Sequence, residues 1–155
     1  MTKPKRGTGR ANTTPRLQDT VRLSAAGLAK VLGDLEARVL RAVWALGKPV
    51  TAREVHERIV RVHDVSPVTT ITVLNKLVTK RVLERVRRDD VFHYSARLDK
   101  PSFMALVTRR VVEGVLSFGP DAVAASLVDV LAKRDPAQLE ELGRLIRRRL
   151  RRDER

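Results

Sequence analysis

Residues 66–80, SPVTTITVLNKLVTK, decide the fold that this chain is predicted to adopt. Ser66 is a favoured N-cap residue, and Pro67 suits the first helical position, where its missing N–H would be unpaired anyway. At 3.6 residues per turn, one face of this helix collects the core-type side chains Thr70, Val73, Leu74 and Leu77. The opposite face and its flanks carry mostly short or polar side chains: Val68, Thr69, Thr72, Asn75, Lys76 and Thr79.

Short side chains on an exposed helix face favour close approach to base edges in DNA. A threonine hydroxyl forms hydrogen bonds with bases, and the methyl groups of threonine and valine contact the methyl group of thymine. The predicted base- or groove-facing residues are Val68, Thr69, Thr72 and Lys76. Taken alone, the stretch is equally compatible with a solvated amphipathic helix.

Two further helices are predicted before this stretch. The first is capped by Asp34 and ends at residues 47–49, and its apolar stripe comprises Leu35, Val39, Leu40, Ala42, Val43, Trp44 and Leu46. Residues 49–50 are expected to form a short edge strand. Thr51 and Glu54 form a capping box that opens the second helix, in which Val55, Ile59 and Val62 share a face. Residues 63–65 then turn the chain toward Ser66.

After Arg81 the pattern changes from helical to alternating. Residues 82–86 and 91–95 are predicted to be two strands joined by residues 87–90. Two helices, a turn, a third helix and a β-hairpin are the pattern of a winged helix-turn-helix, in which the third helix enters the major groove. The predicted phosphate-contacting residues are Arg53, Arg85, Arg87 and Arg88, although a solvated loop charge is the alternative for each wing arginine. Asp89 and Asp90 argue against deep insertion of the hairpin tip.

Residues 99–155 are predicted to form three helices with extensive apolar faces. Gly119-Pro120 separates the first two helices, and Asp135-Pro136 opens the third. Three short helices of about 55 residues cannot enclose a core of their own, so a second copy of the chain is expected to cover them. The predicted dimerisation residues are Phe103, Leu106, Val107, Val111, Leu116, Leu127, Leu131, Leu142 and Ile146.

The composition favours a polyanionic partner. Lys and Arg number 32 against 18 Asp and Glu, which gives a net charge of +14 and a pI near 11.3. Nucleic acid is the first candidate and an anionic membrane surface the second. Residues 1–31 are predicted to be a disordered basic arm, which either lies along DNA or acts as a solubilising tail. No apolar run is long enough for a membrane span, and the protein is predicted to be cytoplasmic.

The sequence does not favour an enzyme or a metalloprotein. The absence of cysteine excludes disulfides, thiolate metal sites and cysteine nucleophiles. His56, His63 and His93 lack neighbouring carboxylates at ligand spacing, and Glu140-Glu141 is typical of a solvated helix face. No phosphate-binding glycine loop or nucleophile motif is present. We therefore expect no catalytic residue, cofactor, metal or small-molecule substrate.

Four segments together resemble the BlaI/MecI/CopY family of penicillinase repressors. They are residues 32–44 (LGDLEARVLRAVW), 49–55 (PVTAREV), 69–77 (TTITVLNKL) and the wing strand 92–94 (FHY). The resemblance covers residues 32 to about 150. It implies a homodimeric winged-helix repressor on a palindromic operator, controlling beta-lactamase or related genes. In such families a membrane sensor-protease often relieves repression by cutting the dimerisation helices.

The chain also departs from that family in several places. It lacks the cysteine-rich metal motif of the copper-responsive branch, and Arg110-Val111 stands where staphylococcal-type members have an Asn-Phe cleavage pair. Arg81 occupies the position of the usual glycine after the recognition helix, so it must either adopt a left-handed conformation or end the helix differently. The basic N-terminal arm is longer than usual.

The predicted organisation is thus an arm (1–31), a winged helix DNA-binding domain (32–98) and a three-helix dimerisation domain (99–155). The fold class is mainly α with a small β-hairpin wing. The predicted function is that of a sequence-specific, homodimeric repressor of transcription that binds double-stranded operator DNA. Two alternatives are an architectural, histone-like DNA binder with little sequence preference, and an interaction module whose basic ends dock on acidic partners or membranes.

Overall fold

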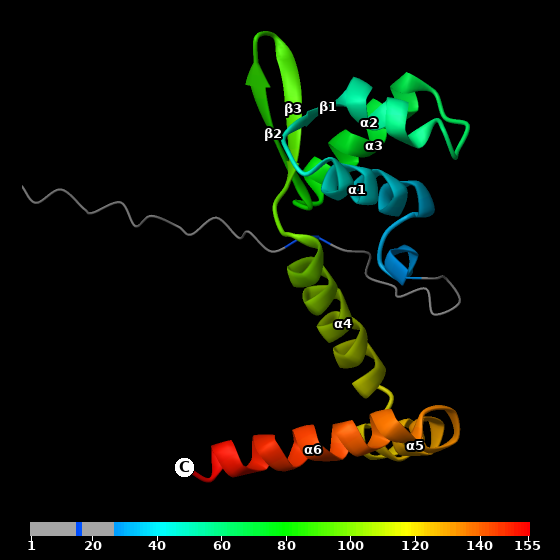
Figure 1. Cartoon of the computed structure of the whole chain (residues 1–155), viewed down its shortest axis with the longest axis vertical. Coiled ribbons are helices and arrows are strands. Elements are labelled where there is room, and N and C mark those ends of the chain that lie inside the picture. The colour runs from blue at the N-terminus through cyan, green and yellow to red at the C-terminus, as the bar shows by residue number, and fades with distance from the viewer. Residues whose placement is uncertain (1–14, 17–26) are drawn as a thin grey trace, which may run out of the picture. The chain divides into compact units, whose positions relative to one another are not determined.

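The computed structural model describes residues 15–16 and 27–155, which belong to two compact units divided between Val107 and Thr108 (Figure 1). Most of the predicted N-terminal arm therefore lies outside the described residues. The chain is mainly helical with a small antiparallel sheet, as its sequence predicts. The division between the units falls inside a helix, and the second unit starts nine residues after residue 99, the predicted start of the dimerisation domain.

The first unit combines helices with a three-stranded sheet, an arrangement consistent with a winged helix-turn-helix (Figure 1). The strand order is β1-β3-β2, and both pairings are antiparallel. In chain order, its elements are η1 (Gly27–Lys30), α1 (Asp34–Leu46), β1 (Val50–Thr51), α2 (Ala52–Ile59), α3 (Pro67–Thr79), β2 (Leu83–Arg88), β3 (Val91–Ala96) and the first part of α4 (Lys100–Leu116).

Side-chain and backbone caps set the helix ends. The Thr51–Glu54 capping box is confirmed: the Glu54 backbone N–H donates to Thr51 Oγ1 (3.3 Å), and the Thr51 N–H donates to Glu54 Oε2 (2.8 Å). Ser66 caps α3 as predicted, since its Oγ accepts the backbone N–H of Thr69 (3.1 Å). The predicted cap at Asp34 is wrong by one residue, because Gly33 is the N-cap and its N–H donates to Glu36 Oε2 (2.9 Å).

The second helix is shorter than predicted. It ends at Ile59, and the N–H groups of Val62 and His63 both donate to the carbonyl of Ile59 in the turn that follows. Val62 consequently leaves the apolar face of α2, and its side chain is 75% exposed. The prediction that Val62 packs with Val55 and Ile59 is wrong.

The hairpin is longer and its turn tighter than predicted. Arg87 and Arg88 belong to β2, and Arg88 pairs with Val91 across a two-residue turn. Asp89 and Asp90 form this turn with φ of +48° and +62°, the left-handed pair that a type I′ turn requires. Aspartate tolerates this region better than most residues with a side chain because of its short polar group.

Arg81 adopts the left-handed conformation that its position demands, with φ of +59°. Its N–H donates to the carbonyl of Val78, and the N–H of Val82 donates to that of Leu77, the two bonds of a Schellman motif. Val82 and Leu77 are both buried, so the motif closes α3 over the core and directs the chain into β2.

The core of the first unit extends beyond the predicted domain at both ends. Leu28 and Val31 are buried, so order begins earlier than residue 32 and the prediction of disorder is wrong for residues 27–31. Phe103 is buried and its ring meets that of Trp44 edge-on at 5.5 Å, while Val107 is also buried. These two predicted dimerisation residues are thus already covered within one chain, which corrects that assignment.

The second unit contains the remainder of α4, α5 (Pro120–Arg134) and α6 (Pro136–Asp153), with α5 and α6 packed against each other. Asp135 caps α6 as predicted by accepting the N–H of Gln138 (3.2 Å). Across residues 108–155 no side chain is buried. In the described residues no single helix is long and apolar enough to cross a membrane; α4 and α5 reach that criterion only jointly, across a 117° bend.

Candidate nucleic-acid interface

The exposed face of α3 carries all four residues predicted to face DNA bases. Val68, Thr69, Thr72 and Lys76 are each exposed, and the side chain of Val68 is 71% exposed despite being apolar. The opposite face packs into the core through Thr70, Val73, Leu74 and Leu77. Because the core holds one face, the other is presented to solvent in a fixed orientation.

The hydroxyl groups on this face are oriented by local hydrogen bonds. Thr72 Oγ1 donates to the backbone carbonyl of Val68 (3.0 Å), and Thr69 Oγ1 lies 2.8 Å from Ser66 Oγ. Because its single proton is used within the helix, the Thr72 hydroxyl presents acceptor lone pairs outward. An acceptor beside methyl groups matches the exocyclic amines of adenine or cytosine and the thymine methyl in the major groove.

Asn75 connects α3 to the hairpin, a role that the sequence did not reveal. Its Oδ1 accepts hydrogen bonds from Arg85 Nη1 (2.7 Å) on β2 and from Tyr94 Oη (3.1 Å) on β3. Arg85 also lies over the ring of Phe92, with its guanidinium carbon 4.4 Å from the ring centroid. The signal available in the sequence was the alternation of the two strands, which makes Arg85 and Tyr94 cross-strand partners.

The predicted phosphate contacts therefore differ in their surroundings. Arg85 is held by Asn75 and Phe92, whereas Arg87 Nη2 pairs with Asp90 Oδ1 at the turn (2.8 Å). Arg88 lies next to the turn and forms no ion pair with any described residue. Arg53, near the start of α2, pairs with Glu57 one turn later (2.9 Å). The ion pairs of Arg53 and Arg87 are exposed, and such pairs contribute little, so neither prevents a phosphate contact.

An ion pair joins the end of α3 to the start of α1 beside this face. Lys80 Nζ lies 2.8 Å from both carboxylate oxygens of Glu36, which is largely buried. Burial raises the pKa of Glu36, but the hydrogen bonds from Lys80 and the Gly33 N–H outweigh it and leave that pKa below its ordinary value. The pair holds the C-terminal end of α3 against α1.

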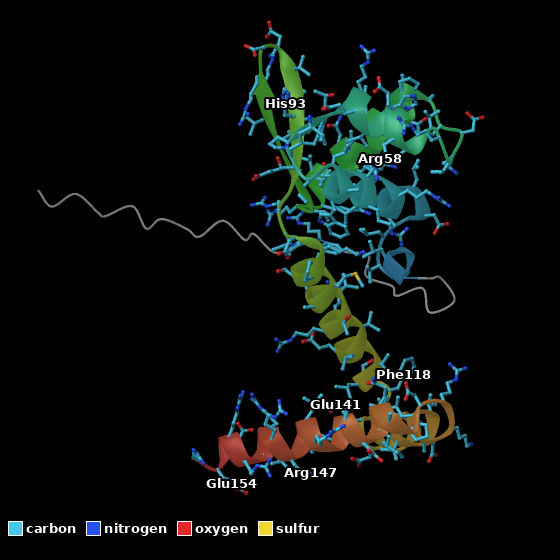
Figure 2. All side chains as sticks on the ribbon, in the orientation of Figure 1. Arg58, His93, Phe118, Glu141, Arg147 and Glu154 are labelled. Carbon is cyan, nitrogen blue, oxygen red and sulfur yellow. The ribbon has the colours of Figure 1, made fainter. Side chains whose placement is uncertain are left out.

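Of the three histidines, His56 has a structural role. His56 Nδ1 lies 3.1 Å from the buried Thr70 Oγ1 and so connects α2 to α3, whereas His93 lies on the hairpin (Figure 2). Within the described part of the chain, no group of three or more His, Asp or Glu side chains could hold a metal ion.

Comparison with known proteins agrees with this geometry. Residues 32–148 match the penicillinase repressor family. The chain is also 36% identical over 64 residues to the protein named transcriptional regulator BlaI from two strains of Mycobacterium tuberculosis, CDC 1551 / Oshkosh and ATCC 25618 / H37Rv. That similarity covers 41% of this chain and 46% of each relative, so it spans about half of their length. Since the family match extends over most of the sequence, the chain belongs to the penicillinase repressor family.

Proposed function

We propose that this protein is a sequence-specific DNA-binding repressor of transcription that acts as a homodimer on a palindromic operator. The observation that carries the proposal is the exposed face of α3, where Val68, Thr72 and Lys76 stand clear of the core on a capped helix. A hairpin bonded to the same helix through Asn75 lies beside it. Family membership and the name of the mycobacterial relatives support the same function.

The homodimer is supported by the uncovered apolar surface of the second unit. A depression of about 520 Å³ lies between α4 and α5, and it is lined almost wholly by apolar side chains, among them Val111, Val115, Phe118, Val123 and Leu127. Phe118 is 82% exposed in the single chain (Figure 2). Exposed apolar surface of this kind is typical of a subunit interface, and a two-fold axis would pair two copies of α3 with two operator half-sites.

Residues Leu106, Val111, Leu116, Leu127, Leu131, Leu142 and Ile146 stay our candidates for this interface. Membership of the family also supports control of beta-lactamase or related genes. We further propose that a membrane sensor-protease relieves repression, as the resemblance to this family implies. Relief by a protease predicts that cells exposed to the inducing compound contain a shortened form of the chain, which immunoblotting would detect.

The proposal is tested by selecting binding sites from random duplexes with the full chain. The wild-type protein is expected to enrich an inverted repeat, and the specific sites should bind at least about 10³-fold more tightly than unrelated duplexes. The variant Thr72→Val keeps the shape of the side chain and removes the hydroxyl, so it should relax the preference at one position of each half-site. Thr108→Val, an exposed substitution of the same type on α4, is the matched control. Equal binding to all duplexes would contradict the proposal.

A further inference from the structure

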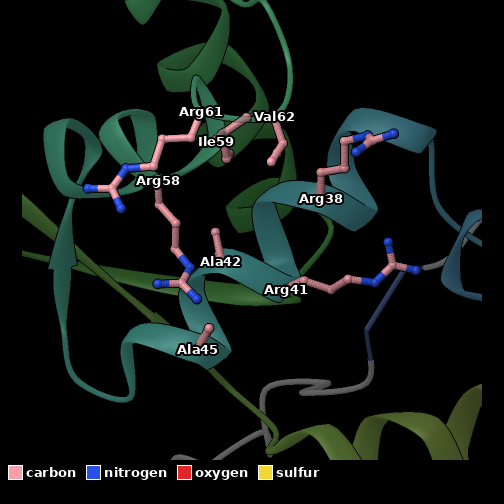
Figure 3. A pocket seen from close by; sticks show the side chains of 8 residues that line it. All are labelled: Arg38, Arg41, Ala42, Ala45, Arg58, Ile59, Arg61 and Val62. Atoms are coloured by element: carbon pink, nitrogen blue, oxygen red, sulfur yellow. The ribbon is translucent and has the colours of Figure 1, made fainter.

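A second basic surface lies on α1 and α2, away from the residues described above. It is a depression of about 470 Å³ lined by eight residues of α1, α2 and the turn that follows α2 (Figure 3). Four of the eight are arginines: Arg38, Arg41, Arg58 and Arg61. None of its lining residues is one of the candidate DNA contacts and none belongs to α3, β2 or β3, although α2 also carries Arg53 near its start.

The arginines of this groove form no ion pair within the described chain, although Glu54 and Glu57 line a neighbouring depression together with Arg58 and Arg61. No described carboxylate forms an ion pair with any of the four guanidinium groups, in contrast to Arg53, Arg87, Arg109, Arg144 and Arg149. Four like charges around one depression repel one another, and an anionic partner would relieve that repulsion. The groove therefore favours an anionic ligand.

The distribution of the four arginines argues for an extended occupant rather than a compact anion. Arg38 and Arg41 extend along one side of the groove from α1, and Arg58 and Arg61 come from the α2 segment opposite (Figure 3). A single phosphate or carboxylate could pair with only some of these four arginines. Several negative groups, spaced along a chain, could pair with all four.

The floor of the groove argues for a peptide rather than nucleic acid. Ala42 and Val62 lie between the two pairs of arginines and Ala45 lies beside Arg58 (Figure 3). Val62 is 75% exposed although Ile59, three residues earlier, is buried. A phosphate backbone has no apolar side chain to bury on an apolar floor, whereas a peptide can place one there. Burial of apolar area in the centre with charge pairs at the rim is the usual anatomy of a protein interface.

We infer that this groove binds an acidic segment of another protein, with one apolar side chain on the floor and flanking carboxylates paired to the arginines. The inference is independent of the proposed operator binding, because it uses a different surface. It would allow the protein to contact a protein partner while α3 remains available to DNA.

The test measures fluorescence anisotropy of a labelled peptide, in which one leucine is flanked on both sides by aspartates and glutamates, against the full chain. The wild-type protein is expected to bind it, and Arg41→Ala with Arg58→Ala, one change from each wall, should weaken binding at least about tenfold. The control, Arg147→Ala with Arg148→Ala on α6, removes the same charge elsewhere and should leave the affinity within about twofold. Val62→Ser, at an exposed position, should weaken binding without any change in charge.

Several results would overturn the inference. They are absence of binding to the wild-type protein, equal binding of a peptide with asparagine and glutamine in place of the acids, or equal binding of a peptide with serine in place of leucine. If the two double variants weakened peptide binding equally, the peptide would be attracted by the net charge of the protein and not by this groove. If Arg41→Ala with Arg58→Ala instead flattens the salt dependence of duplex binding, the groove contacts DNA phosphates. Unchanged thermal melting of each variant confirms that the fold is intact.

Discussion

Glu36 and Lys80 form the ion pair whose loss is expected to reduce the stability of the fold most. Lys80 Nζ lies at the same distance, 2.8 Å, from both carboxylate oxygens of Glu36, and Glu36 is only 8% exposed. A partly buried charge without its partner keeps its desolvation penalty and gains nothing in return. The contact also fixes the end of α3, on which the predicted base contacts stand.

Lys80→Met should therefore reduce the free energy of unfolding at neutral pH by about 2 kcal/mol. Because the folded-state pKa of Glu36 lies below the ordinary 4.5, the stability from this group is present above pH 4.5 and is lost as the pH falls further. The difference between variant and wild type should shrink over that acidic range. Urea unfolding as a function of pH measures it. Lys100→Met, an exposed change at the start of α4, is the control and should cost less than about 0.5 kcal/mol.

At the scale of the element, Asn75 makes the hairpin and α3 move together. Both of its bonds to β2 and β3 end on the same oxygen, Oδ1, so removing that atom releases Arg85 and Tyr94 at once. The cation–π contact of Arg85 with Phe92 depends on the same placement of the guanidinium group. The orientation of the hairpin relative to the exposed face of α3 thus depends on a side chain that does not itself need to touch DNA.

Asn75→Ala should cost about 1–2 kcal/mol and accelerate amide hydrogen exchange throughout β2 and β3. Operator affinity should fall while the preferred bases stay the same, because Val68, Thr69 and Thr72 are untouched. Thr79→Ala, on the same face one turn later, removes a hydroxyl bonded only to its own helix and should change neither property. Slower or unchanged exchange in the hairpin of the Asn75 variant would contradict the coupling.

The wing arginines next to the turn give a separate prediction. Arg87→Ala with Arg88→Ala should weaken binding to every duplex, and the slope of log affinity against log salt should become shallower by about 0.9 for each phosphate that the wing no longer neutralises. The control is Arg109→Ala with Arg110→Ala on α4, which removes an equal charge. A constant slope in the wing variant would mean that the hairpin does not touch phosphate.

Much of the secondary structure could be predicted from local signals, because caps and periodicity act over a few residues. Ser66-Pro67, the Thr51–Glu54 box and Asp135-Pro136 each marked a helix start correctly. The errors came where tertiary contacts decide. Periodicity cannot show that Val62 leaves its helix after Ile59, or that Phe103 meets Trp44 across a large sequence separation.

The candidate site was only partly predictable for the same reason. Exposure of Val68, Thr69, Thr72 and Lys76 follows from the helical wheel alone, and all four are exposed. Their contact with DNA stays a prediction. The contacts of Arg85 and the role of Asn75 depend on how the hairpin is seated against α3, which no local pattern encodes.

At the scale of the whole molecule, the second unit leaves its apolar surface uncovered in the single chain. Residues 108–155 bury no side chain, and the depression between α4 and α5 exposes apolar surface to water. A charge placed in that depression should prevent association with little effect on the first unit, whose core is closed by Leu40, Leu74 and Phe103.

Leu127→Glu should therefore convert the protein to a monomer at micromolar concentration, as measured by sedimentation equilibrium. The melting temperature of wild type should rise with protein concentration, whereas that of the variant should not. Operator affinity should fall by at least about 10²-fold, because a monomer binds only one half-site, whereas in a dimer the first subunit holds the second close to its own half-site. Asp129→Glu on the same helix is the control. A wild-type protein that is monomeric at this concentration would refute the dimer.

Leu28 and Val31 have a practical consequence for anyone who shortens this protein. The family similarity starts at residue 32, which makes that position a natural place to cut. A fragment trimmed there would lack two side chains that are 3% and 0% exposed, and the hollow left beside α1 would cost several kcal/mol, on the order of 2–5 for a leucine alone. Expression from residue 27 or earlier keeps Leu28 and Val31 in the core. The first residue of the family similarity is therefore not the first residue that the packed domain needs.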